Sequence, residues 1–276
     1  MKTFISKLLL CAIFLAPGVQ VFGQEEPVDR LSVAFSDPSR PGLLKASLIT
    51  GSISVTGYEG KEVVIEARTR TKRYSKESRS RSGDLKRIPI RSTGLTVEEQ
   101  HNEMEVGAAS HMRAIDLDIK MPKKTSLKLS TVNSGDIVVE RVEGEIELNN
   151  VNGSIKAHNI SGSVVANTTN GKVEVTFDKV EPDKPMSFVS FNGRVDVTLP
   201  ANVKADVKMK SEQGEIYSDF DIKIEQKPKL IKEDTRKRGG KYKVRIENAI
   251  YGTINGGGPQ YYFSTYNGSI YIRKSE

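Results

Sequence analysis

Short runs of alternating apolar and polar residues recur along the chain, and this period of two is typical of β-strands with one buried face. The alternation is most regular over residues 135–175, where a glycine stands at every ninth position. The residues two and four positions after each glycine are apolar, and the residues between them are mostly polar. This pattern predicts one short strand per nine residues. The predicted inward residues are Ile137, Val139, Ile146, Leu148, Ile155, Ala157, Val164, Ala166, Val173 and Val175.

The glycines are predicted to turn the chain between strands by adopting positive φ, which glycine reaches without a Cβ clash. Asn-Gly pairs at 152–153, 170–171, 192–193 and 267–268 carry the same turn chemistry. The residue two positions before each glycine is predicted to be a further inward anchor. These anchors are Asn133, Val142, Val151, Ile160 and Thr169, and the structural turn glycines are Gly135, Gly144, Gly153, Gly162, Gly171, Gly193 and Gly268.

A constant nine-residue spacing with one inward phase favours a coil over a series of hairpins. Asn152 and Asn170 are 18 residues apart, as are Asn149 and Asn167, so each coil is predicted to contain two strands. Self-similarity at a fixed short period indicates a β-solenoid or β-helix-like stack. The predicted fold class is therefore all-β, with successive coils about 4.8 Å apart.

The same glycine-led pattern returns near Gly51, Gly193, Gly214 and Gly268, with longer spacings. The alternating segments 62–68 and 114–122 are also predicted strands. The two largest gaps between glycines contain strongly basic segments, 68–91 and 227–245. These segments are predicted to be insertions in which the chain leaves the coils and then rejoins them.

Residues 1–23 are predicted to be a secretory signal peptide, because two lysines, a short apolar run and small residues follow one another. A retained membrane anchor is a weaker interpretation, since a spanning helix needs about 20 apolar residues. Cys11 leaves a lipoprotein as an alternative, although Leu10 stands where a small residue is expected. Residues 24–276 are then a single exported domain with no transmembrane span, in the periplasm, on the outer surface or outside the cell.

The net charge of +7 is unevenly distributed. Segment 68–91 carries ten basic and two acidic residues, and segment 227–245 carries nine and two, so the rest of the mature chain is acidic. Export and this distribution argue against nucleic acid and indicate an anionic surface instead. Solvated loops remain the alternative. The candidate anionic-surface residues are Arg68, Arg70, Lys72, Arg73, Lys76, Arg79, Arg81, Lys86, Arg87, Arg91, Arg236, Lys237 and Arg238.

No catalytic, cofactor or metal motif is recognisable in the sequence. The three histidines do not form an HExxH pair, and the glycine repeats lack the aspartates of a calcium-binding β-roll. Paired acidic residues such as Glu145 and Glu147 are interpreted as solvated charges. The aromatic residues near the C-terminus are predicted to cap the last coil, with sugar stacking as the alternative. They are Tyr261, Tyr262, Phe263, Tyr266 and Tyr271.

The [NS]-G-x-[IV] repeats of residues 127–177 and the closing segment GTINGGGPQYYFSTYNGSIYIRK together resemble the DUF4097 family of β-strand-repeat proteins, often called adhesins. The resemblance extends over roughly residues 45–274. It implies a β-solenoid-like fold in or outside the cell envelope, and it implies no catalytic residues. The predicted function is a non-enzymatic binding or structural module, whose partner is an envelope glycan, an anionic lipid or another envelope protein. An envelope-stress sensor and a carbohydrate-active enzyme are the alternatives.

Overall fold

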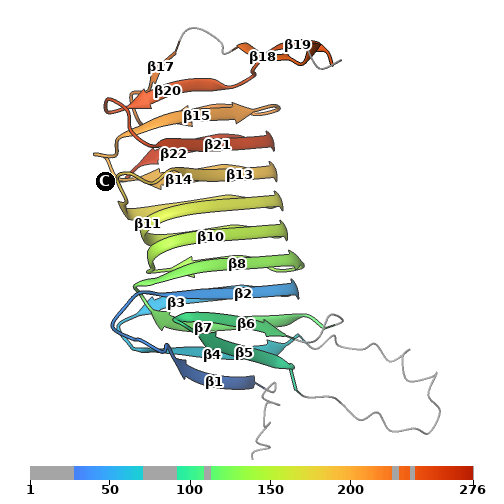
Figure 1. Cartoon of the computed structure of the whole chain (residues 1–276), viewed down its shortest axis with the longest axis vertical. Coiled ribbons are helices and arrows are strands. Elements are labelled where there is room, and N and C mark those ends of the chain that lie inside the picture. The colour runs from blue at the N-terminus through green and yellow to red at the C-terminus, as the bar shows by residue number, and fades with distance from the viewer. Residues whose placement is uncertain (1–27, 71–91, 109–112, 226–229, 237–239, 276) are drawn as a thin grey trace, which may run out of the picture.

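The structure is a computed structural model that describes residues 28–70, 92–108, 113–225, 230–236 and 240–275. The described residues form strands and contain no α-helix, so the predicted all-β class is confirmed. Twenty of the strands are stacked one above another as a single hydrogen-bonded sheet (Figure 1). The predicted signal peptide lies outside the described residues.

The stacked strands form two ladders. Ladder A consists, in spatial order, of β5 (Leu95–Gln100), β6 (Glu103–Ala108), β2 (Gly42–Thr50), β8 (Thr125–Asn133), β10 (Glu143–Asn152), the second half of β11 (Ile155–Asn170), β13 (Met186–Asn192), β21 (Gln260–Asn267), β15 (Ala205–Ser211), β20 (Ile250–Ile254) and β17 (Lys223–Ile224). Its strands from β6 to β15 are parallel.

Ladder B takes the other strand of each coil. It consists of β1 (Val28–Ala34), β4 (Glu62–Thr69), β7 (Ile115–Pro122), β3 (Ile53–Tyr58), β9 (Ile137–Glu140), the first half of β11, β12 (Val173–Val180), β14 (Val195–Leu199), β22 (Ile270–Lys274) and β16 (Ile216–Ser218). Strand β11 therefore passes from one ladder to the other. In both ladders the central strands pair with partners 18 residues away, as in Gly144 with Gly162 and Ile137 with Ile155.

The core lies between the two ladders. All ten residues predicted two and four positions after the glycines are buried there. Each coil contributes two or three such side chains from each ladder, because a strand presents alternate residues to the same face.

The predicted anchor two residues before each glycine is right for Val142 and Ile160, which are fully buried. It is wrong for Asn133, Val151 and Thr169, which are exposed. At that edge of the stack the buried residues are polar, and they are Thr131, Asn150 and Thr168. Nine residues are therefore not the true repeat, because the two edges of each coil turn in different ways.

Most of the turn glycines serve close approach between coils. Gly135, Gly153, Gly171, Gly193 and Gly268 follow one another along one edge, and none has positive φ. A Cβ on Gly171 would lie 2.2 Å from the carbonyl oxygen of Gly153, and the others meet the glycine of the coil below in the same way. The predicted positive φ is thus wrong for these five. It is found at the opposite edge, where Gly162 has φ of 142°.

A column of buried polar side chains supports this edge from inside. Each donates a hydrogen bond to a glycine carbonyl in the neighbouring coil, as in Thr168 Oγ1 to Gly153 O at 2.8 Å and Ser190 Oγ to Gly171 O at 2.7 Å. The full set of donors is Thr131, Asn150, Thr168, Ser190 and Thr265, which are buried, and Ser211, which is half-buried. Outside, the amides of Asn133, Asn152, Asn170, Asn192 and Asn267 form a hydrogen-bonded ladder with distances of 2.6 to 3.1 Å.

The order of coils departs from the order of the sequence. Strands β21 and β22 lie between the β13–β14 coil and the β15–β16 coil, and they pair on both sides. The C-terminal aromatic residues therefore do not cap the last coil, and that prediction is wrong. Tyr261 and Phe263 are buried in the core instead.

Candidate functional site

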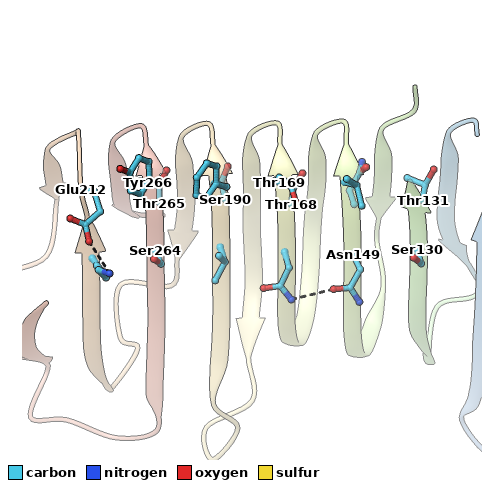
Figure 2. A pocket seen from close by; sticks show the side chains of 16 residues that line it. Ser130, Thr131, Asn149, Thr168, Thr169, Ser190, Glu212, Ser264, Thr265 and Tyr266 are labelled. Atoms are coloured by element: carbon cyan, nitrogen blue, oxygen red, sulfur yellow. Dashed lines mark hydrogen bonds and ion pairs between the residues drawn. The ribbon is translucent and has the colours of Figure 1, made fainter. Parts of the chain in front are cut away.

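An open groove with a volume of about 590 Å³ runs along the outer face of ladder A, across the strands (Figure 2). Two rows of outward side chains line it, and each row takes one residue from each successive strand. We call them the apolar row and the polar row. The apolar row is Val151, Thr169, Phe191 and Tyr266 within the groove, and it continues beyond the groove with Val132 and Ile49. The polar row is Ser130, Asn149, Asn167, Val189, Ser264 and Lys210, in which Val189 is the one apolar member.

The apolar row is exposed although it is mostly hydrophobic. Phe191 is 49% exposed and Tyr266 is 42% exposed, and the three aliphatic residues beside them are similarly open. The two rings are stacked, with centroids 4.9 Å apart and planes within 6°. Single exposed apolar residues are ordinary on protein surfaces, whereas a contiguous exposed apolar row is uncommon.

The fold holds this row in register. The glycine edge lies immediately beyond it, because Phe191 and Tyr266 each precede an Asn-Gly pair. The buried Ser190 and Thr265 next to them are bonded to glycine carbonyls at 2.7 and 2.8 Å. The outward side chains are therefore mounted on a backbone that is fixed from both sides.

The polar row offers amides and hydroxyls. Asn167 donates to Asn149 at 3.3 Å, and Asn149 donates to Glu147 at 3.0 Å. An asparagine amide has two N–H donors and a carbonyl acceptor, so both residues keep capacity for further hydrogen bonds. Figure 2 shows Ser130, Asn149 and Ser264 along the groove, below the level of Thr169 and Tyr266.

The charged residues at the groove are held in ion pairs. Lys210 Nζ lies 2.8 Å from Glu212, at the end of the two rows. This contact lowers the pKa of Glu212 and raises the pKa of Lys210, because the hydrogen bond between the two side chains, and then their opposite charges, stabilise the charged forms. Further along the same face Lys128 lies 3.0 Å from Glu147 and lowers the pKa of that carboxyl.

The outer face of ladder B has a different character. A run of acidic and basic side chains pairs across its strands, as in Arg273, which forms two hydrogen bonds to Asp196 at 2.7 and 3.2 Å. Tyr217 and Tyr271 form a stacked pair there as well, with centroids 5.1 Å apart. This face resembles an ordinary solvated surface with mixed charges.

The described residues of the basic segments do not come together. Arg68 pairs with Glu66 at 2.8 Å, and Arg70 contacts Asp116 at 2.6 Å, the carbonyl of Ser134 and the hydroxyl of Ser52. Arg236 lies beside β18 (Leu230–Asp234) and β19 (Tyr242–Ile246), a separate two-stranded sheet, and stacks on Tyr242. Figure 1 shows β4 near one end of the stack and this hairpin at the other.

The remaining basic candidates lie outside the described residues. They are Lys72, Arg73, Lys76, Arg79, Arg81, Lys86, Arg87, Arg91, Lys237 and Arg238. Among the described residues no group of histidine, cysteine or acidic side chains is arranged to hold a metal ion. Nor does that part of the chain contain a helix long and apolar enough to cross a membrane.

Sequence reasoning missed the groove, because it assigned Val151 and Thr169 to the core. The signal was nevertheless present. Four Asn-Gly pairs are each preceded by a residue of the apolar row, in VNG, TNG, FNG and YNG. The polar donors one position earlier, Asn150, Thr168, Ser190 and Thr265, repeat with them and could have set the inward phase.

Comparison with known proteins finds a family match for the middle of the chain. Residues 131–255 match the family model described as Toastrack DUF4097, which confirms the resemblance found in the repeats. No curated protein matches the chain.

Solved structures are also similar to the chain. One is a "putative cell adhesion protein" from Clostridium sporogenes ATCC 15579, with 12% identity, a TM-score of 0.49, and coverage of 90% of this chain and 100% of its own. Another is a "putative adhesin" from Bacteroides fragilis NCTC 9343, with 8% identity, a TM-score of 0.35, and coverage of 91% and 98%. A third is a "putative lipid binding protein" from Parabacteroides distasonis ATCC 8503, with 10% identity, a TM-score of 0.24, and coverage of 90% and 97%.

Proposed function

We propose that this protein, whose residues 131–255 match the Toastrack DUF4097 family, is an exported β-solenoid that acts as a binding module of the cell envelope or cell surface. The groove on the outer face of ladder A is its binding site. The protein acts by holding a partner and not by transforming it.

The apolar row is the observation that carries this proposal. Its exposed side chains would lower their free energy by about 25 cal/mol for each Å² of apolar surface that a partner covers. Two stacked aromatic rings stand in its second half, and aromatic residues are the commonest energetic centres of binding surfaces. Except for Thr169 its side chains are hydrophobic, and none of them carries a charge.

The titratable groups at the groove support binding over catalysis. A general acid or base works best with a pKa near the operating pH. The ion pair between Lys210 and Glu212 moves both pKa values away from neutrality, upward for the lysine and downward for the carboxyl. Both groups stay charged near pH 7, so neither is ready to exchange a proton.

Export rests on the signal peptide predicted for residues 1–23, and it gives the groove access to envelope components. Rigidity favours the same role. Strands that are hydrogen-bonded on both sides and packed on a shared core lose little conformational freedom when a partner binds.

Co-sedimentation with envelope fractions of the source organism tests the proposal. The purified protein should bind, and the double variant Phe191→Ala/Tyr266→Ala should bind at least about tenfold more weakly, which is the loss expected when aromatic contacts are removed from a binding centre. Tyr217→Ala is the matched control, because Tyr217 is 47% exposed and stacks on Tyr271 on the opposite face.

Each variant should first show an unchanged far-ultraviolet circular dichroism spectrum, since a stacked exposed pair contributes only about 0.5–1.5 kcal/mol to stability. Equal binding by wild type and the double variant would overturn the groove as the site. Binding that is lost equally in the Tyr217 control would do the same.

A further inference from the structure

Building on the proposed function, we infer that the occupant of the groove is an uncharged glycan strand that lies along the stack, across the strands of ladder A. The inference concerns the chemistry of the partner, which neither the fold nor the family match assigns. Three properties of the groove lead to it.

The first property is neutrality. The charged side chains that line the groove, Lys210 and Glu212, are paired with each other at 2.8 Å. On the same face Lys128 is paired with Glu147 at 3.0 Å, and Lys208 with Glu247 at 2.6 Å. An anionic headgroup or an acidic polymer would have to break one of these pairs to gain another. A neutral partner leaves these ion pairs intact and meets a surface that carries no net charge.

The second property is the kind of hydrogen bonding that is available. Four members of the polar row, Ser130, Asn149, Asn167 and Ser264, present amides and hydroxyls, which donate and accept as the hydroxyl groups of a sugar do. The backbone is not available, because the strands from β8 to β21 are hydrogen-bonded on both sides. A peptide that binds as an added strand needs a free sheet edge, and the groove has none.

The third property is the pairing of the two rows. A pyranose ring has faces rich in C–H bonds and an equator of hydroxyls. A glycan strand can therefore cover the outward edges of the stacked Phe191 and Tyr266 rings with its C–H groups, while its hydroxyls reach Asn149 and Asn167 on the neighbouring strands β10 and β11. An acyl chain would cover the same aromatic residues, but it would also cover the asparagine amides without bonding to them, which is unfavourable.

The dimensions of the stack agree with a polymer. Neighbouring strands are about 4.8 Å apart, so both rows repeat at that interval along the groove. This interval is close to the length of one sugar residue in an extended chain. Successive sugars can therefore meet successive strands, and affinity should rise with chain length until the rows are covered.

Chemical treatment of the envelope fraction tests the inference. One portion is oxidised with periodate, which cleaves vicinal diols in sugars, and is then reduced. A second portion is digested with protease, and a third is left untreated. Wild-type protein, Phe191→Ala/Tyr266→Ala and the control Tyr217→Ala are then co-sedimented with each portion.

We expect groove-dependent binding to persist after protease and to be lost after periodate. Asn167→Ala should weaken binding to the untreated portion about three- to tenfold, as expected for one lost hydrogen bond. Binding that is lost after protease overturns the glycan inference and leaves the proposed function standing. Binding that survives both periodate and trifluoromethanesulfonic acid, which also cleaves glycosidic bonds in chains without vicinal diols, does the same. Absence of groove-dependent binding to the untreated portion overturns the proposed function itself.

Discussion

Replacing Gly171 by alanine should destabilise the protein far more than alanine does at an open position. A Cβ at Gly171 would lie 2.2 Å from the carbonyl oxygen of Gly153 and 2.5 Å from its carbonyl carbon. Because ordinary contacts between such atoms begin near 3.5 Å, the two coils would have to separate locally by about 1 Å. The backbone conformation itself is not the obstacle, since φ at Gly171 is not positive.

The loss in free energy of unfolding can be estimated from the contacts that this separation disturbs. Overpacking costs about 1–3 kcal/mol. The Gly153 carbonyl also accepts from Thr168 at 2.8 Å, and the Gly153 amide donates to Asn170 at 3.0 Å. Weakening both bonds adds about 0.5–1.5 kcal/mol each, while alanine recovers about 0.5–1 kcal/mol of chain entropy. The net loss is about 3 kcal/mol.

Urea unfolding followed by circular dichroism measures this loss. Gly107→Ala is the matched control, because Gly107 also lies in ladder A and an added Cβ there meets no atom within 4 Å. The control should be as stable as wild type or up to about 1 kcal/mol more stable. If Gly171→Ala unfolds within about 1 kcal/mol of Gly107→Ala, close approach does not explain the glycine column.

Three further predictions concern single side chains. Thr168→Val keeps the shape but removes the donor to Gly153 O, so it should lower the free energy of unfolding in urea by about 1–2 kcal/mol. The same change at its exposed neighbour, Thr169→Val, should be nearly neutral, and equal losses would contradict the polar column. Burial raises the pKa of Tyr261 to about 12, so its contribution to stability is complete below pH 10 and is lost as the pH rises through 12. Tyr261→Phe should reduce this alkaline loss. Since the buried hydroxyl has no hydrogen-bond partner, the variant should also be at least as stable as wild type at pH 7. A marked loss of Tm at pH 7 would show that the hydroxyl is bonded after all. Arg70→Ala should cost about 1 kcal/mol because it leaves Asp116 and the Ser134 carbonyl without their cation, and an unchanged urea midpoint would return Arg70 to the surface-docking candidates.

The strand pattern was predictable because burial on one face leaves a strict period of two. Every apolar residue two or four positions after a repeat glycine is buried, from Ile137 to Val175. The edge beside the groove was not predictable from hydrophobicity, since its inward residues are polar. Thr168 faces the core in order to bond a glycine carbonyl, and this turns Thr169 outward.

The order in which the coils stack also could not be predicted from the sequence pattern. Repeats of similar sequence offer nearly equivalent faces to one another, so adjacency along the chain does not determine which coils stack. Here Gly214 lies against Gly268 and not against Gly193, because the C-terminal coil is inserted between two earlier ones. That insertion brings Tyr266 beside Phe191 and creates the aromatic pair of the groove.

The salt dependence of binding tests the central claim most directly, because the groove is neutral and the basic segments are not. Wild type and Phe191→Ala/Tyr266→Ala would be co-sedimented with envelope fractions from low to high ionic strength. Contacts between exposed charges weaken as salt screens them, whereas apolar contacts do not. The account predicts binding by wild type that changes little with salt and is lost in the double variant. Binding that falls steeply with salt and is the same in both proteins would contradict it, and would place the partner on the basic segments instead.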